Sequence, residues 1–389
     1  MASIQTFEDK NRKRRYKVSW ELSRKDGQRH RQSKTFPPGT KKSTVEEFKR
    51  QKELELIMGD TFVNSEITLS KFVEDVYFPT YCAQLSQSTV VNYRRLYDSS
   101  KDYCIKKRFG SYKMKDIKRR MVQDYANFLS TVVTPKTVSE YIHWLHTVYD
   151  TAIKEEIIKP SCNPTEMLKL PRREKPKIEA FTLEQYNLLL ASTADDRCNR
   201  LVIGLGGLAG LRRAEIMGLR WKDIDLDVPE PVMRIVNTRI YTGGKIYEKA
   251  PKSQAGMRVI PLPQTLVRIL KDERKFYLEN KLKYGANFND SGYVVVKEDG
   301  TPRRPGSVAD HYTCYVKRME KVHGIPYMSL HKLRHTYASL LIDGGANAVV
   351  VQKNLGHEDV SMTMKNYVHT YDAARRREVD NLDCRIKIS

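Results

Sequence analysis

The chain has 389 residues, 40% of them hydrophobic, which is enough for two or three domains with buried cores. Its formal net charge of +22 indicates a polyanionic partner, most often nucleic acid. The sequence shows no apolar run near the ~20 residues of a membrane span, no signal peptide and, among its six cysteines, no Cys-x-x-Cys pair, which disfavours membrane, secreted and zinc-binding classes.

The first 65 residues predict a small basic domain. Apolar residues alternate with polar ones in a pattern typical of a strand with one buried face: Tyr16, Val18, Trp20 and Leu22. Asp26-Gly27 indicates a hairpin turn, and residues 32–36 predict the returning strand. A helix is expected to begin with a capping box within residues 43–47 and to end near Met58. We interpret this segment as a DNA-binding domain that lays strands in a groove, with an unstructured basic arm as the alternative.

Residues 66–168 predict a helical domain. Apolar residues recur at helical spacing in four stretches, 69–76, 90–96, 117–129 and 138–149. Their predicted solvent faces are rich in lysine and arginine, the residues that contact DNA phosphates. Residues 169–180 are charged and carry two prolines, which favours an interdomain linker. Thr182 is then expected to cap the first helix of a last domain, residues 181–389.

Short motifs in this last domain combine cations, imidazoles and a phenol. Gly210-Leu211-Arg212 follows an apolar helix predicted at 201–208, and Glu215 lies one turn beyond. A predicted strand from Met233 to Tyr241 and a second one from Ile246 to Lys249 precede Pro251-Lys252 and the strand-like segment Arg258-Val259-Ile260. Three further motifs complete the set: His331-Lys332-Leu333-Arg334, Leu355-Gly356-His357 and Asn366-Tyr367-Val368-His369.

The residue types in these motifs suit phosphoryl transfer. Guanidinium groups bind phosphate oxygens bidentately and keep their charge at every physiological pH. His331 and Arg334 lie three residues apart in a helical stretch, so both project from one face. A tyrosine hydroxyl, with an unperturbed pKa of about 10, becomes a nucleophile beside a base or a cation.

In this order the motifs resemble the two signature boxes of the tyrosine recombinase (phage-type integrase) family. The first box reads Gly-Leu-Arg-x-x-Glu and the second reads His-x-x-Arg, Leu-Gly-His and Tyr; here Ala209 replaces the usual Thr. The layout is most similar to integrases of Gram-positive conjugative transposons and prophages. It implies a multidomain fold: a small α+β arm-type DNA-binding domain at 1–65, an all-α core-binding domain at 66–168, a linker at 169–180, and a mixed α/β, mainly helical catalytic domain with a C-terminal tail at 181–389.

The resemblance also implies a catalytic set, in which Glu215 orients the site and the groups acting on DNA are Arg212, Lys252, His331, Arg334, His357 and Tyr367. Tyr367 would attack phosphorus and form a 3′-phosphotyrosyl bond, while Lys252 would protonate the leaving 5′-oxygen. Because the covalent link conserves the bond energy, neither ATP nor a metal or other cofactor is expected. Three of these assignments have an alternative of the same residue type. Arg213 is the alternative to Arg212, Tyr371 is the alternative to Tyr367, and Lys245 or Lys249 is the alternative to Lys252.

The same resemblance implies the reaction and the partners. We expect a recombinase that integrates and excises a mobile genetic element through a Holliday junction, acting as a homotetramer on double-stranded DNA with core and arm sites. A DNA-bending host protein and an excisionase are further expected partners, and the bacterial cytoplasm, in association with the nucleoid, is the expected location. Two other functions stay open: a non-catalytic DNA-binding regulator and a type IB topoisomerase. A metal-dependent nuclease is disfavoured because no clustered carboxylate pair accompanies the arginines.

Overall fold

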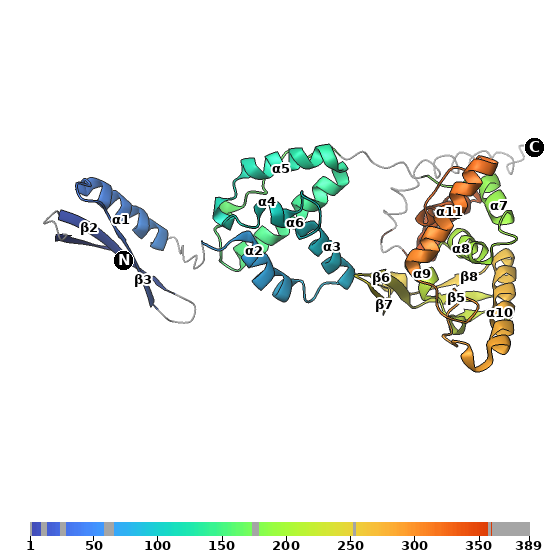
Figure 1. Ribbon diagram of the computed structural model, residues 1–389. Coiled ribbons are helices and arrows are strands. Elements are labelled where there is room, and N and C mark those ends of the chain that lie inside the picture. Colours follow the sequence, from blue (N-terminus) through green and yellow to red (C-terminus); the bar gives the residue numbers. More distant parts are fainter. Residues whose placement is uncertain are drawn as a thin grey trace, which may run out of the picture. The chain divides into compact units, whose positions relative to one another are not determined.

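The computed structural model describes residues 2–8, 14–23, 29–57, 66–172, 179–251, 254–356 and 359. The chain divides into two compact units, residues 1–174 and 175–389, and Figure 1 labels most of their helices and strands. Within the described ranges, none of the helices combines the length and the apolar character that a membrane crossing requires.

The N-terminal part of the first unit is an antiparallel sheet with one helix. The sheet has the order β1-β2-β3, and its elements are β1 (Ala2–Glu8), β2 (Arg14–Ser23), β3 (Arg29–Thr35) and the helix α1 (Lys42–Ile57). Val18 and Phe36 from the strands pack with Val45 and Phe48 from α1 into a small core. The side chains that alternate with Val18 along the strands therefore face away from α1.

Two of the predicted strands in this part are confirmed, and two details of the prediction are wrong. The sequence did not predict β1, because Ala2–Glu8 contains few large apolar residues. The predicted capping box at residues 43–47 is absent, because α1 begins at Lys42 and the amides of Thr44 and Val45 bond to the carbonyl of Lys41. The Asp26-Gly27 turn and Met58 lie outside the described residues.

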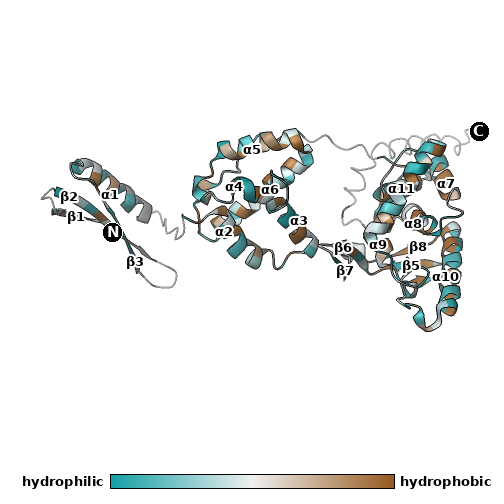
Figure 2. Ribbon diagram, viewed as in Figure 1, coloured by the Kyte–Doolittle hydropathy of each residue, from teal (hydrophilic) through white to brown (hydrophobic). Residues whose placement is uncertain are grey.

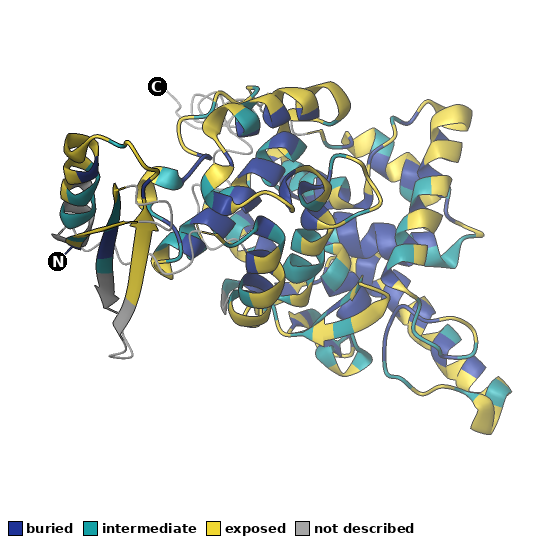
Figure 3. Ribbon diagram, turned by 60° about the vertical axis from the view of Figure 1, so that its left-hand side comes forward, coloured by how far each residue is buried: buried dark blue, intermediate teal, exposed yellow. Residues whose placement is uncertain are grey.

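Helices form the remainder of the described first unit: α2 (Leu69–Phe72), the π-helical segment η1 (Val73–Tyr81), α3 (Gln87–Tyr97), α4 (Ile105–Phe109), α5 (Arg119–Val132) and α6 (Pro135–Lys154). Figure 2 shows apolar and polar residues alternating along α5 and α6, and Figure 3 shows the buried residues where helices meet. Trp144 lies at the centre of this core, with the rings of Tyr77 and Tyr97 centred 5.9 and 5.7 Å away. Pro79 lies inside η1, where the π-helical turn accommodates a residue without a backbone N–H.

The second unit surrounds the apolar helix α8 (Arg197–Leu208) with further helices: α7 (Leu183–Ala191), α9 (Arg213–Gly218), α10 (Gln264–Tyr284), α11 (Pro305–His323), α12 (Leu330–Asp343) and α13 (Ala348–Leu355). Thr182 caps α7 in a capping box with Gln185, as predicted. Glycines let the neighbours approach α8 closely. A Cβ atom on Gly206 would lie 2.9 Å from Leu333 of α12, and one on Gly207 would lie 2.2 Å from the ring of Tyr186.

Two small sheets complete this unit. One has the order β4-β5-β8, and the other is a hairpin of β6 and β7: β4 (Ile224–Asp225), β5 (Val232–Ile235), β8 (Arg258–Pro261), β6 (Thr238–Thr242) and β7 (Lys245–Lys249). The single strand predicted from Met233 to Tyr241 is wrong, since the chain passes from one sheet to the other at Val236 and Asn237. Asn237 Oδ1 accepts a hydrogen bond from the Thr238 amide, a local bond that competes with strand pairing.

Candidate active site

Arg212 lies where the chain leaves α8 and enters α9. Gly210 has a positive φ of 65°, and a Cβ atom there would lie 2.4 Å from the ring of Tyr337, so this turn requires glycine. Leu211 then points into the core, while Arg212 takes the N-cap position of α9. Glu215 accepts hydrogen bonds from the Arg212 amide (2.9 Å) and from Arg212 Nη1 (2.7 Å). The Gly-Leu-Arg-x-x-Glu sequence thus holds both the backbone and the side chain of Arg212 through a glutamate in the first turn of the following helix.

Glu215 is also held by a second arginine. Its carboxylate is buried and accepts hydrogen bonds from Arg258 Nη1 (3.1 Å) and Arg258 Nη2 (2.9 Å). Burial by itself raises the pKa of Glu215, but the hydrogen bonds and charges of Arg258 and Arg212 outweigh it and lower the pKa from 4.5 to about 2. The carboxylate is therefore ionised at physiological pH.

Arg334 and His331 both come from α12 but differ in exposure. Arg334 is buried, donating from Nη1 to the carbonyl of Gly210 at 2.8 Å and from Nη2 to the carbonyl of Leu355. His331, in the first turn, lies at the rim of the site with its side chain partly exposed and partly covered by protein. Partial burial lowers the pKa of His331, and Arg334 and Arg212 lower it further, so its ring is neutral at pH 7 and able to accept a proton.

The C-terminal end of α13 meets the same arginines. Gly356 ends the helix in the left-handed conformation, with a φ of 62°, which glycine adopts more readily than any other residue. Its carbonyl accepts a hydrogen bond from Arg212 Nη2 at 3.3 Å. Since Arg334 binds the preceding carbonyl of Leu355, the two motif arginines converge on the turn that directly precedes His357 in the sequence.

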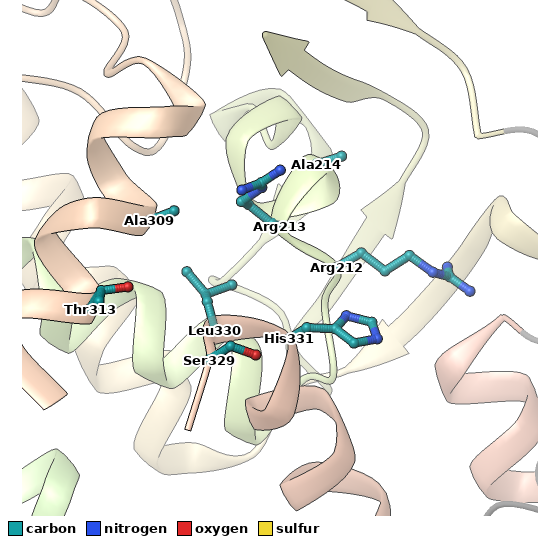
Figure 4. Close-up of a pocket in the computed structure, with 8 residues that line it drawn as sticks. All are labelled: Arg212, Arg213, Ala214, Ala309, Thr313, Ser329, Leu330 and His331. Atoms are coloured by element: carbon teal, nitrogen blue, oxygen red, sulfur yellow. The ribbon is translucent and has the colours of Figure 1, made fainter. Parts of the chain in front are cut away.

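A cavity of about 540 Å³ adjoins this group. It is lined by Arg212, Arg213, Ala214, Ala309, Thr313, Ser329, Leu330 and His331. Figure 4 shows that the side chains of Arg212 and His331 extend toward the same side of the cavity, while Arg213 extends in a different direction. The exposed Arg213 is thus separated from the carboxylate and carbonyl contacts that Arg212 makes.

The predicted site residues fall into two groups. Four of them, Arg212, Glu215, His331 and Arg334, are brought together around the end of α13. Three others lie outside the described residues: Lys252, His357 and Tyr367. The described residues contain no group of His, Cys, Asp or Glu side chains that could hold a metal ion.

Arg258 is a site residue to which the sequence assigned no role. A signal was present, because Arg258 and Ile260 occupy the same face of a period-2 pattern and Ile260 is buried. An arginine on the core-facing side of a strand needs a buried partner. Its partner, Glu215, lies 43 residues earlier in the chain, and sequence spacing does not reveal such a pairing.

Comparison with known proteins identifies the family. The phage integrase family model matches residues 179–374, and the phage integrase SAM-like domain model matches residues 69–168. The chain belongs to the phage integrase family. It is a tyrosine-type site-specific recombinase, so the predicted recognition, enzyme class and function are confirmed.

Relatives within this family align along most of the chain. A tyrosine recombinase XerC-like protein of Caldanaerobacter subterraneus subsp. tengcongensis is 28% identical over 391 aligned positions, covering 96% of this chain and 97% of that protein. The ICEBs1 integrase of Bacillus subtilis is 25% identical and covers 79% of this chain and 83% of its own.

Solved structures of integrases share the fold. The Tn1549 transposon integrase in complex with transposon right end DNA has a TM-score of 0.65 at 21% identity, covering 82% of this chain and 100% of that one. A lambda integrase tetramer bound to a Holliday junction has a TM-score of 0.56 at 16% identity, covering 93% and 94%. The predicted multidomain fold class is confirmed.

Proposed function

We propose that this integrase moves a conjugative transposon or related mobile element by cutting and rejoining DNA at the site built around Arg212 and Arg334. One observation carries the proposal: both guanidinium groups meet at the end of α13, immediately before His357, although they are 122 positions apart in the sequence. Phosphoryl transfer requires several fixed cations around one phosphate, and this convergence supplies them.

The proposed cleavage step is a transesterification. The Tyr367 oxygen attacks phosphorus, a P–O bond to tyrosine forms, and the bond from phosphorus to the 5′-oxygen breaks. His331, neutral at pH 7, takes the phenol proton, and Lys252 gives a proton to the leaving 5′-oxygen. His357 donates a hydrogen bond to a non-bridging oxygen. The 5′-hydroxyl of a partner strand reverses the step and completes the exchange.

Arg212 would bind the non-bridging oxygens directly, and the buried Arg334 would add its positive charge to neutralise the charge that grows on them. Of the two, Arg212 is the more accessible, since 38% of its side chain is exposed. Its 3.3 Å contact with the Gly356 carbonyl is long, and a phosphate oxygen is a stronger acceptor than a carbonyl. We therefore infer that Arg212 exchanges this carbonyl for DNA when the substrate binds.

The remaining parts of the chain would bind DNA outside the cleavage site. We propose that residues 1–65 form an arm-binding domain that uses the sheet face opposite α1, where Lys17 and Arg31 lie. Residues 66–168 would bind the core site, and residues 169–180 would link them to the catalytic domain. A homotetramer on DNA, helped by a DNA-bending host protein and an excisionase in the bacterial nucleoid, is the proposed assembly.

The test is a suicide-substrate assay in the presence of EDTA. Core-site DNA from the element's junctions, nicked beside the cleavage position, traps the covalent intermediate because the short fragment that carries the released 5′-hydroxyl diffuses away. We expect a slow, protease-sensitive band with the wild type and with Tyr371→Phe, and no such band with Tyr367→Phe. A verified gel shift without any covalent band would instead support the non-catalytic regulator, and a band retained by Tyr367→Phe would place the nucleophile elsewhere.

A further inference from the structure

Three consecutive carbonyls at the end of α13 are each held by a different arginine. The carbonyl of Asn354 accepts from Arg258 Nε at 2.7 Å, that of Leu355 from Arg334 Nη2, and that of Gly356 from Arg212 Nη2 at 3.3 Å. The last carbonyls of a helix have no partner within the helix and carry partial negative charge. The three arginines therefore act together as the cap of α13.

Two arginines of this cap, Arg258 and Arg212, also bind Glu215, and Arg258 makes more hydrogen bonds to protein than Arg212 does. Beyond the Asn354 carbonyl and the two oxygens of Glu215, its Nη1 donates to the carbonyl of Gly256 at 3.1 Å. All three of its guanidinium nitrogens thus bond to protein, and 6% of its side chain is exposed. Arg212, with 38% exposed, shares the same carboxylate from the solvent side.

The charges of Glu215, Arg212 and Arg258 together determine how strongly Arg212 can attract a phosphate. A buried carboxylate paired with Arg212 alone would form a neutral pair, and Arg212 would be attracted to Glu215 in competition with a phosphate. With Arg258 present, the three groups carry a net charge of +1. That excess positive charge lies on the exposed guanidinium, which is the one beside His331 and the cavity.

We propose that Arg258 is a positioning residue for phosphate recognition, which serves as the permanent counter-charge of Glu215 and so leaves Arg212 oriented and free to bind a non-bridging phosphate oxygen. This inference rests on the proposed role of Arg212 as a phosphate ligand. Arg258 itself does not touch DNA, because its nitrogens are occupied beneath the site.

The geometry requires arginine at position 258. The forked guanidinium reaches both oxygens of Glu215 while its Nε bonds to Asn354, an arrangement that a lysine ammonium cannot reproduce. Arg258→Lys keeps the charge but loses the fork, so Arg212 would be displaced rather than neutralised. A misplacement of about 1 Å in such a site costs on the order of 10²-fold in rate.

The test compares two substrates in the suicide-cleavage assay with the full-length protein. One carries the ordinary phosphodiester, and the other carries a methylphosphonate, in which a methyl group replaces one charged non-bridging oxygen. We expect Arg258→Lys to slow phosphodiester cleavage by about 10²-fold. On the methylphosphonate this defect should shrink by at least about tenfold, because the phosphorus centre then carries less negative charge for Arg212 to neutralise. Arg234→Lys is the matched control, since Arg234 lies on the neighbouring strand β5 and pairs with Asp225 at the surface. It should match the wild type on both substrates.

Arg212→Lys distinguishes failure of the inference from failure of the proposed function. If its defect shrinks on the methylphosphonate but that of Arg258→Lys does not, Arg258 has no role through Arg212 and the inference is overturned. If neither defect shrinks, Arg212 does not neutralise the phosphate, and the proposed role of Arg212 fails as well.

A paired variant covers the case in which Arg258→Lys does not fold. Arg258→Gln alone leaves Glu215 with Arg212 as its counter-charge, whereas Arg258→Gln combined with Glu215→Gln removes both charges together. The inference predicts that the double variant cleaves the phosphodiester at least about tenfold faster than Arg258→Gln, a difference of about 1.4 kcal/mol in activation free energy. A double variant no faster than Arg258→Gln would overturn it.

Discussion

Glu215→Gln tests how strongly the buried carboxylate stabilises the second unit, residues 175–389, which we call the catalytic unit. Glutamine has the shape of a protonated glutamate, so the substitution mimics protonation without a change of pH. The native pKa of Glu215 is about 2 against 4.5 for an unperturbed glutamate. Each pKa unit corresponds to 1.36 kcal/mol, so ionisation stabilises the fold by about 3 kcal/mol at pH 7.

The sign of the pH dependence follows from the lowered pKa. Stability from this group is complete above pH 4.5 and is lost as the pH falls toward 2. Between pH 7 and pH 3.5 the wild type should lose about 1.4 kcal/mol from Glu215 alone, and Glu215→Gln should not lose it. The stability difference between the two proteins should therefore narrow by that amount.

Calorimetric unfolding of the full chain measures both quantities. For a unit the size of residues 175–389, about 3 kcal/mol corresponds to a fall of roughly 6–12 °C in the melting temperature of its transition at pH 7. Glu279→Gln is the control, because Glu279 forms an exposed pair with Lys275 that should contribute less than about 1 kcal/mol. A loss at Glu215 no larger than the control's, or a difference that does not narrow at pH 3.5, would refute this reasoning.

Three further predictions address other parts of the chain. Gly207→Ala should destabilise the catalytic unit by about 1–3 kcal/mol in urea unfolding, because the new methyl group meets the ring of Tyr186 at 2.2 Å; an unchanged midpoint would show that the ring can move aside. Because the pKa of His331 is lowered below 6.5, the single-turnover cleavage rate should fall by less than about twofold between pH 7.5 and 6.5, and a larger fall that His331→Gln abolishes would contradict a neutral imidazole. Arg31→Ala should weaken binding to arm-site DNA and reduce the slope of log K against log salt by about 0.9, whereas an unchanged slope would mean that Arg31 binds no phosphate.

The elements that follow from local rules were predictable. The apolar run at α8, the Thr182 capping box and the Gly356 helix end each depend on a few neighbouring residues, and their sequence patterns are specific. The order of motifs along the catalytic domain identified the family, since the domain model matches the same stretch of chain. The functional roles of all the predicted site residues stay predictions, and three of them, Lys252, His357 and Tyr367, lie outside the described residues.

The features that escaped prediction depend on contacts between distant segments. The strand expected from Met233 to Tyr241 divides between two sheets because β5 pairs with β8, and no pattern within the strand encodes that partner. Arg258 illustrates the same limit. Its position on the inward face of β8 is readable from alternation, but its meaning depends on Glu215 and on the carbonyl of Asn354.

The arginine cap explains how a cationic site can be rigid before DNA arrives. Three guanidinium groups packed around one helix end would repel one another, and the cost would increase with burial. Here the repulsion is offset within the protein by the Glu215 carboxylate and by the carbonyls of Gly210, Leu355 and Gly356. The buried members of the cap therefore need little reorganisation on binding, and preorganised charge of this kind is what lowers a phosphoryl-transfer barrier. In the proposed mechanism the movement that engages the substrate therefore belongs to Arg212, because among the three arginines it has the greatest exposure and the longest carbonyl contact.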